Sequence, residues 1–175
     1  MHGKITVAAL IAVAGIVSGV QAQSTSASGT FRDWSYFVIA EPKECLAVSA
    51  PRSWSVTQDG ETVTAQRGDI RFYISIQPGD GGAGVPSFGA GYPLAQSARV
   101  EMKIDGTTFY LLPNADTNAE FAWAQPEDDS GIIAAMRGGA EATVIGQSAR
   151  GKVTTDNFSL FGFTAAYEKA QELCQ

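Results

Sequence analysis

Apolar and polar residues alternate one for one along residues 69–77 of this sequence. The apolar positions are Ile70, Phe72, Ile74 and Ile76, and residues 100–104 repeat the pattern. Successive side chains of a β-strand point to opposite faces, so this period of two indicates strands with one buried face. The chain is therefore expected to fold around an antiparallel β-sheet.

Aromatic and β-branched residues predict further strands along most of the chain. These are expected at residues 34–40, 45–49, 108–112, 121–123, 142–148 and 152–160. Turn residues separate three hairpins, at Glu41-Pro42-Lys43, Asp105-Gly106 and Arg150-Gly151. The stretch 53–68 is polar and contains the turn signal Asp59-Gly60, and residues 78–86 are rich in glycine and are expected to form a loop.

Two segments have the periodicity of helices. Residues 126–137 begin with acidic side chains, which suit the positive end of a helix dipole, and stop before Gly138-Gly139. Residues 164–173 form the second expected helix, whose apolar face is Phe163, Ala166, Tyr167, Ala170 and Cys174. These elements predict a mainly β fold, an antiparallel β-sandwich-like core with two peripheral helices, one of them C-terminal.

The start of the chain has the pattern of a secretory signal. A short basic segment precedes an uncharged apolar run at residues 5–20, and Val20-Gln21-Ala22 suits a signal peptidase. We expect a signal peptide at residues 1–22, a flexible leader at 23–30 and a single β-rich domain at 31–175. The alternative is an uncleaved anchor. With cleavage after Ala22, no transmembrane span is expected in the mature protein, which would be periplasmic or secreted.

The chain has two cysteines, and both lie beyond the predicted signal. An even number of cysteines in an exported chain favours a disulfide, here between Cys45 and Cys174. The alternative is two unpaired, buried thiols. Because Cys174 shares the apolar face of the last predicted helix, a bridge to Cys45 would pin that helix across the first hairpin.

Several kinds of chemistry are excluded by composition. His2 is the only histidine and lies within the predicted signal, so the mature chain lacks the base of a Ser-His-Asp or Cys-His site and lacks histidine metal ligands. No catalytic residue, metal site or cofactor is therefore predicted, and the sequence does not identify ligand-binding residues. The net charge of −6 makes nucleic acid an unfavourable partner.

Four shorter patterns each have a structural and a functional interpretation. Residues 146–151 resemble a nucleophile elbow around Ser148 but lack its second glycine, so a turn is favoured. Residues 79–84 are glycine-rich without leading into a helix, which favours a plain loop over a phosphate site. Arg67-Gly68-Asp69 spells an integrin-recognition tripeptide, although a turn entering a strand also explains it. A last set, Trp34, Trp54, Tyr92 and Trp123, suits a ligand groove or, as we favour, packing in the core and hairpins.

Longer matches extend in order along the chain. They are Asp33-Trp34, Cys45, Arg67-Gly68-Asp69, Gly91-Tyr92-Pro93, Phe109, Ala122-Trp123-Ala124, Ala135-Met136-Arg137-Gly138-Gly139, Ser148-Ala149-Arg150-Gly151, residues 155–166 and Cys174. With these runs the sequence resembles the invasion-associated locus B family of exported bacterial proteins, and residues 155–166 are the most specific part. The family is named for a factor that helps a pathogen enter red blood cells. The resemblance implies a β-rich envelope or secreted domain and supplies no catalytic residues.

The leading functional hypothesis is a non-enzymatic binding protein whose partner is a protein or a component of the cell envelope. One alternative is a periplasmic hydrolase that uses carboxylates, and another is a purely structural envelope component. The absence of histidine from the predicted mature chain favours binding over catalysis.

Overall fold

The computed structural model describes residues 25–79, 81–117 and 119–175. These residues form β-strands, two α-helices and one short 3-10 helix, Ala115–Thr117. The strands are β1 Thr25–Phe31, β2 Trp34–Ile39, β3 Glu44–Ser49, β4 Ser53–Gln58, β5 Glu61–Thr62, β6 Arg71–Ile76, β7 Val85–Gly89, β8 Val100–Ile104, β9 Thr107–Pro113, β10 Phe121–Ala124, β11 Glu141–Gln147 and β12 Val153–Ser159. The helices are α1 Asp129–Gly138 and α2 Phe163–Cys174.

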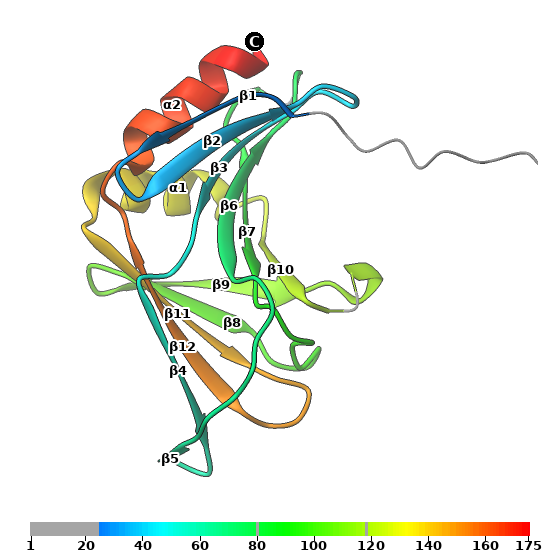
Figure 1. The fold of residues 1–175 in the computed structure, drawn as a ribbon, viewed down its shortest axis with the longest axis vertical. Helices are drawn as coiled ribbons and strands as arrows, with labels where there is room; N and C mark the ends of the chain where they lie inside the picture. Colours follow the sequence, from blue (N-terminus) through cyan, green and yellow to red (C-terminus); the bar gives the residue numbers. More distant parts are fainter. Residues whose placement is uncertain (1–24, 80, 118) are drawn as a thin grey trace, which may run out of the picture.

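The strands of the described residues join into one twelve-stranded antiparallel sheet. Its order is β1-β2-β3-β6-β7-β10-β9-β8-β11-β12-β4-β5. The sheet bends strongly. The axes of strands β1, β2, β3, β6 and β7 lie roughly along one direction, and those of β8, β11, β12 and β4 lie across it (Figure 1). The predicted mainly β fold, with two helices of which one is C-terminal, is confirmed.

The core lies between the two halves of this bent sheet. Phe158 on β12 meets Phe72 on β6 and Phe88 on β7 edge to face, with ring centroids 6.0 and 6.2 Å apart. The indole Nε1 of Trp34 on β2 donates a hydrogen bond to the carbonyl of Ser159, at 2.8 Å. Because β12 lies far from β2, β6 and β7 in the sheet order, these contacts show that the sheet closes over its own inner face.

Helix α2 covers the open end of this core. Its buried face comprises Phe163, Ala166, Tyr167, Ala170 and Cys174, as the sequence predicts. A disulfide joins Cys174 to Cys45 on β3, with the two Cα atoms 5.8 Å apart, so the predicted bridge is present. A disulfide of this kind indicates an oxidising, extracytoplasmic location. Neither described helix is long and apolar enough to cross a membrane.

The structure differs from the sequence prediction at four strands. Residues 25–31, most of them assigned to the flexible leader, form the edge strand β1 and pair with β2. Strand β4, the two-residue strand β5 that pairs with it, and strand β7 were not predicted. In β4 only Val56 is buried, and in β7 four successive residues are buried, so neither strand alternates. Periodicity reveals strands with one buried face and misses edge strands and strands covered on both faces.

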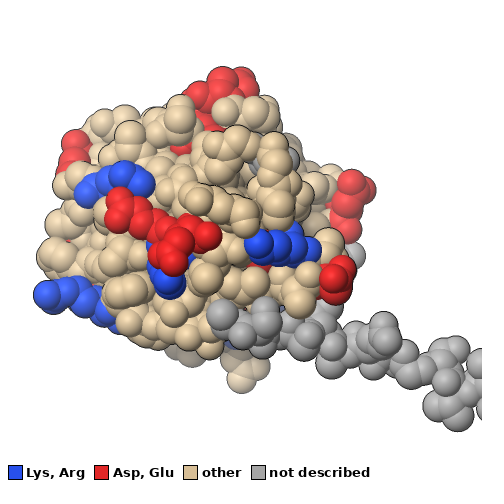
Figure 2. Space-filling model, turned by 90° about the horizontal axis from the view of Figure 1, so that it is seen from above, with Lys and Arg blue, Asp and Glu red and all other residues tan. Residues whose placement is uncertain are grey.

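The surface is charged without large areas of one sign on the face that Figure 2 shows. Acidic and basic side chains lie interspersed among uncharged ones there. Exposed ion pairs of opposite charge include Arg52–Asp33, at 2.7 Å, and Lys103–Glu101, at 3.1 Å. Residues 1–22, the predicted signal peptide, lie outside the described residues.

Candidate functional site

The most heavily buried ion pair among the described residues joins Arg67 and Asp156. Arg67 precedes β6, and Asp156 lies on β12. The guanidinium donates from Nη1 to Oδ1 at 2.5 Å and from Nη2 to Oδ2 at 3.0 Å. The Arg67 side chain is 3% exposed, and that of Asp156 is 0% exposed. Such a bidentate pair fixes the position of both groups, because the guanidinium fork matches the two carboxylate oxygens.

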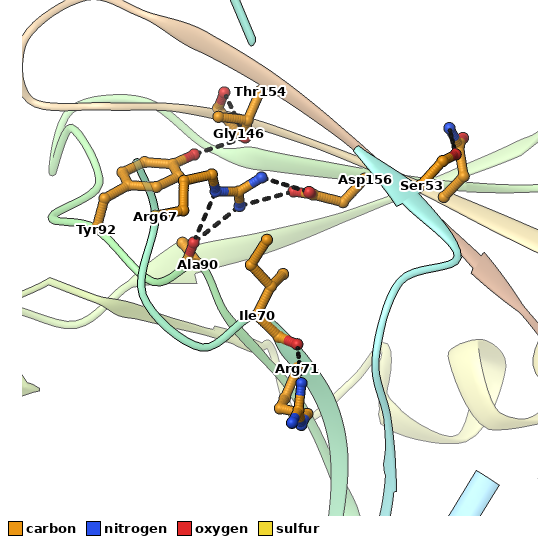
Figure 3. Close-up of polar contacts among 10 residues, drawn as sticks. Ser53, Arg67, Ile70, Arg71, Ala90, Tyr92, Gly146, Thr154 and Asp156 are labelled. Carbon is orange, nitrogen blue, oxygen red and sulfur yellow. Dashed lines mark hydrogen bonds and ion pairs between the residues drawn. The ribbon is translucent and has the colours of Figure 1, made fainter. Parts of the chain in front are cut away.

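The remaining surfaces of the guanidinium are also occupied. Nε and Nη2 of Arg67 donate to the carbonyl oxygen of Ala90, at 3.2 and 2.8 Å. The rings of Tyr92 and Trp54 lie 5.0 and 5.4 Å from the guanidinium carbon. Figure 3 shows Arg67 reaching between the Tyr92 ring and Asp156, with Ala90 beneath it. Arg67 therefore links the segment before β6, the loop after β7 and strand β12.

Two glycines allow these segments to come together. The amide of Gly68 donates to the carbonyl of Gly91, at 2.8 Å. Gly91 has a φ of +69°, and a Cβ atom added to it would lie 2.8 Å from the backbone of Gly68. Only glycine fits this crossing, because a side chain would clash and the positive φ would be strained. The runs 67–69 and 91–93 therefore depend on each other.

The tyrosine beside Arg67 is held neutral and oriented. Its hydroxyl lies 2.7 Å from the hydroxyl of Thr154 on β12. Burial raises the pKa of Tyr92 above its ordinary value, an effect that Thr154 and Arg67 partly offset. Burial also raises the pKa of Asp156, while the hydrogen bonds and charge of Arg67 act in the opposite direction. The cluster is thus a fixed support in which Tyr92 presents one edge to its surroundings.

A groove opens beside this cluster. Its volume is about 580 Å³. Its lining residues come from β4, the segment before β6, the loop after β7, the residue before β10, the β11–β12 turn and β12. They are Val56, Thr64, Ala65, Gln66, Arg67, Gly91, Tyr92, Pro93, Glu120, Ser148, Ala149, Arg150, Lys152 and Thr154. Most of these side chains are polar or charged, so the groove suits contact with a polar partner.

The sequence-predicted candidates divide between the groove and other places. Trp34 is fully buried in the core, whereas Trp54 is 45% exposed and covers Arg67. Tyr92 lines the groove. Trp123 lies on β10 beside Phe121, with ring centroids 5.6 Å apart. The structure therefore brings Trp54 and Tyr92 together at Arg67, while Trp34 serves the core and Trp123 lies on another strand.

The tripeptide Arg67-Gly68-Asp69 does not present its arginine to solvent. The Arg67 side chain is enclosed by Asp156 and two rings, whereas Asp69 is largely exposed and pairs with Arg71 at 2.7 Å. Ser148 belongs to the β11–β12 turn, where its hydroxyl accepts a hydrogen bond from the amide of Lys152 at 3.0 Å. Ser148 therefore lies in the turn that the sequence analysis favoured, whereas residues 67–69 do not form the turn expected there.

Asp156 is the site residue that the sequence analysis missed. It lies on the same face of β12 as Thr154 and Phe158, both buried. A carboxylate on the inward face of a strand requires a partner. The alternation of inward and outward residues along this segment could therefore have identified Asp156 as a paired, buried residue. Across the described residues, no three His, Cys, Asp or Glu side chains gather in a group that would hold a metal ion.

Comparison with known proteins shows that another protein shares this architecture. No curated protein matches the sequence. Among solved structures, the crystal structure of invasion associated protein B from Bartonella henselae is similar to this chain with a TM-score of 0.56 and 16% sequence identity. The alignment covers 85% of this chain and 98% of that one, which shows a shared fold.

Three of the sequence runs that carried the resemblance contribute to the groove. They supply Arg67, residues 91–93 and residues 148–150, and nearby Asp156 belongs to the run 155–166. The model of the invasion associated locus B (IalB) protein family matches residues 56–171, more than half of the chain. The chain therefore belongs to the invasion associated locus B family.

Proposed function

We propose that this chain is a non-enzymatic binding protein of the periplasm or the secreted fraction, and that it engages a protein or an envelope component through the groove beside Arg67. Export by a signal peptide at residues 1–22 is part of the proposal. The Cys45–Cys174 disulfide supports it, because such bridges persist in oxidising compartments outside the cytoplasm.

The observation that carries the proposal is the groove with its fixed support. Arg67 and Asp156 are fully engaged with each other, so the groove has a rigid wall that needs no ligand to form. The groups that remain free to meet a partner are the edge of Tyr92, the cations of Arg150 and Lys152, and the carboxylate of Glu120. Preformed walls reduce the ordering cost of binding.

The groove also bears on the alternative of a carboxylate hydrolase. Glycoside hydrolysis needs two carboxyl groups that flank one bond. Among the described residues that line the groove, Glu120 is the one carboxylate, and nearby Asp156 is held by Arg67. This arrangement supports recognition rather than acid–base chemistry at this place.

Photocrosslinking in living cells of the native host would test the proposal. A photoreactive residue replaces Gln66 at the groove rim or, as a control, the exposed Lys103 on β8. We expect one discrete covalent adduct from position 66 and none of the same mass from position 103. Equal adducts from both positions, or none from position 66, would refute binding through the groove and favour a purely structural component.

A further inference from the structure

One wall of the groove is a short length of chain fastened at both ends. The amide of Val63 donates to the carbonyl of Val56, at 2.9 Å. At the other end, Gly68 is bonded to Gly91, and the Arg67 side chain is locked to Asp156. We call residues 64–66, between these anchors, the strap. It is held in place without belonging to a strand of the sheet.

The main chain of the strap is free to pair. Within residues 25–79, 81–117 and 119–175, no hydrogen bond uses the backbone N–H or C=O of Thr64, Ala65 or Gln66. Exposure alternates along residues 63–67, from half-buried to exposed and back, which is the period of an extended chain. An anchored, extended segment with free polar groups is a template for an added strand.

The wall of the groove opposite the strap carries positive charge. Arg150 and Lys152 lie there, in the β11–β12 turn, and neither makes an ion pair with a described residue. Glu120 supplies the one opposing charge in the lining. Because Asp156 neutralises Arg67, these two cations outweigh Glu120 and make the lining positively charged in a chain of net charge −6. This pattern is complementary to a partner that carries carboxylates.

We infer that the groove binds an extended, acidic polypeptide segment of a partner protein, an inference that rests on the proposed function and names its ligand class. The segment pairs by backbone hydrogen bonds with the strap. Its acidic side chains meet Arg150 and Lys152 across the groove. Main-chain pairing favours a polypeptide over an anionic glycan, because a glycan has no regular alternation of N–H and C=O groups to match the strap.

Synthetic octapeptides provide the probe. In the first, Glu alternates with Thr, and matched peptides replace each Glu by Gln or by Lys. Two further peptides keep the Glu residues but carry N-methyl groups at alternate backbone positions. One peptide has them at the odd positions and the other at the even positions. Fluorescence anisotropy measures their binding to the purified exported protein, residues 23–175, with its disulfide intact.

We expect the Glu peptide to bind about tenfold more tightly than the Gln peptide, with the Lys peptide weakest, since two exposed ion pairs contribute about that factor. One of the N-methylated peptides should bind about tenfold more weakly than the parent, because it loses main-chain bonds. Amide chemical shifts should change at residues 64–66. Equal binding of the Glu and Lys peptides, indifference to N-methylation at both sets of positions, or shifts away from the strap would each overturn the inference.

Charge variants give the matched control. Arg150→Gln with Lys152→Gln should weaken binding of the Glu peptide about tenfold, whereas Lys43→Gln with Lys103→Gln removes the same charge elsewhere and should change it less than about twofold. A Gln66 cross-link in cells without binding of the Glu peptide would leave the proposed function standing and refute the ligand class. Binding of the peptide at the strap without that cross-link would support the ligand class and refute the proposed role in cells.

Discussion

At the scale of single residues, Arg67 fixes how the two halves of the sheet meet. Its guanidinium satisfies both carboxylate oxygens of Asp156 and the carbonyl of Ala90 while lying between two aromatic rings. Lysine would provide a charge but not the planar fork. The position therefore requires arginine for its geometry, and the groove owes one rigid wall to that requirement.

Removing one member of the buried pair should destabilise the protein strongly. Asp156→Leu or Arg67→Met should each lower the free energy of unfolding by about 3–5 kcal/mol, because the remaining charge is left buried and uncompensated. The double variant should lose less than the sum of the single losses. Urea unfolding followed by tryptophan fluorescence measures all three.

The matched control for that series is Arg52→Met. Arg52 also pairs with an aspartate, but its side chain is 53% exposed, so about 1 kcal/mol or less should be lost. If Asp156→Leu cost no more than Arg52→Met, Arg67 and Asp156 would not form the support described for the groove.

Asp33 should make stability depend on pH in a defined direction. The hydroxyl of Ser159 and the guanidinium of Arg52 lower the pKa of Asp33. A lowered native pKa contributes stability above the unfolded value of about 3.9, and this is lost as pH falls through the native pKa. Asp33→Asn should therefore cost about 0.2–1 kcal/mol at pH 7, after solvent screening, and less as the pH is lowered toward 2. A loss that persists undiminished at pH 2 would contradict this assignment.

The sequence revealed these residues unevenly. The strand pattern places Asp156 on the same inward face as Phe158. Arg67 belongs to one of the sequence runs that carry the family resemblance. Their pairing could not be read, because 89 residues separate them and the contact depends on how far the sheet bends. The contact between Gly68 and Gly91 could not be predicted from the sequence either, because it forms where two loops cross.

At the scale of elements, the helices and one-sided strands follow from local pattern. Helix α2 buries the face that its spacing predicts, and β6 buries Phe72, Ile74 and Ile76 in strict alternation. Strands β4 and β7 depend on tertiary pairing instead. The first has one buried residue, and the second is covered on both faces.

The disulfide should hold α2 in place. Cys45→Ser or Cys174→Ser should lower the free energy of unfolding by about 2–5 kcal/mol, because the reduced unfolded chain gains conformational freedom over a separation of 129 residues. The amides of α2 should exchange with solvent before those of the sheet. Hydrogen exchange with peptide-level mass spectrometry measures this order. A variant with unchanged stability, or one in which the sheet opens first, would contradict the role given to the bridge.

At the scale of the whole molecule, the fold is one bent sheet, and the proposed binding groove lies where distant segments meet. The sequence alone predicted the fold class, the bridge and the family. It did not predict the groove, because the strap, the loop after β7 and the β11–β12 turn become neighbours only when the sheet closes on itself. The proposed export concerns the whole chain and is tested separately.

The mature protein should begin at Gln23. Intact-mass measurement on protein from the envelope and culture medium of the native host should give the mass of residues 23–175 with one disulfide, since Val20-Gln21-Ala22 suits signal peptidase. Full-length chain in the membrane fraction would instead show an uncleaved anchor.

Binding through the groove is tested most directly by hydrogen exchange on the purified protein, alone and in the presence of a solubilised envelope extract of its own host. We predict that protection increases at residues 63–67, 91–93 and 148–152, while strands β9 and β10, which do not line the groove, exchange as before. Protection confined to β9 and β10, or unchanged exchange around the groove under conditions in which the extract yields the Gln66 cross-link, would contradict the assignment of the groove as the binding site.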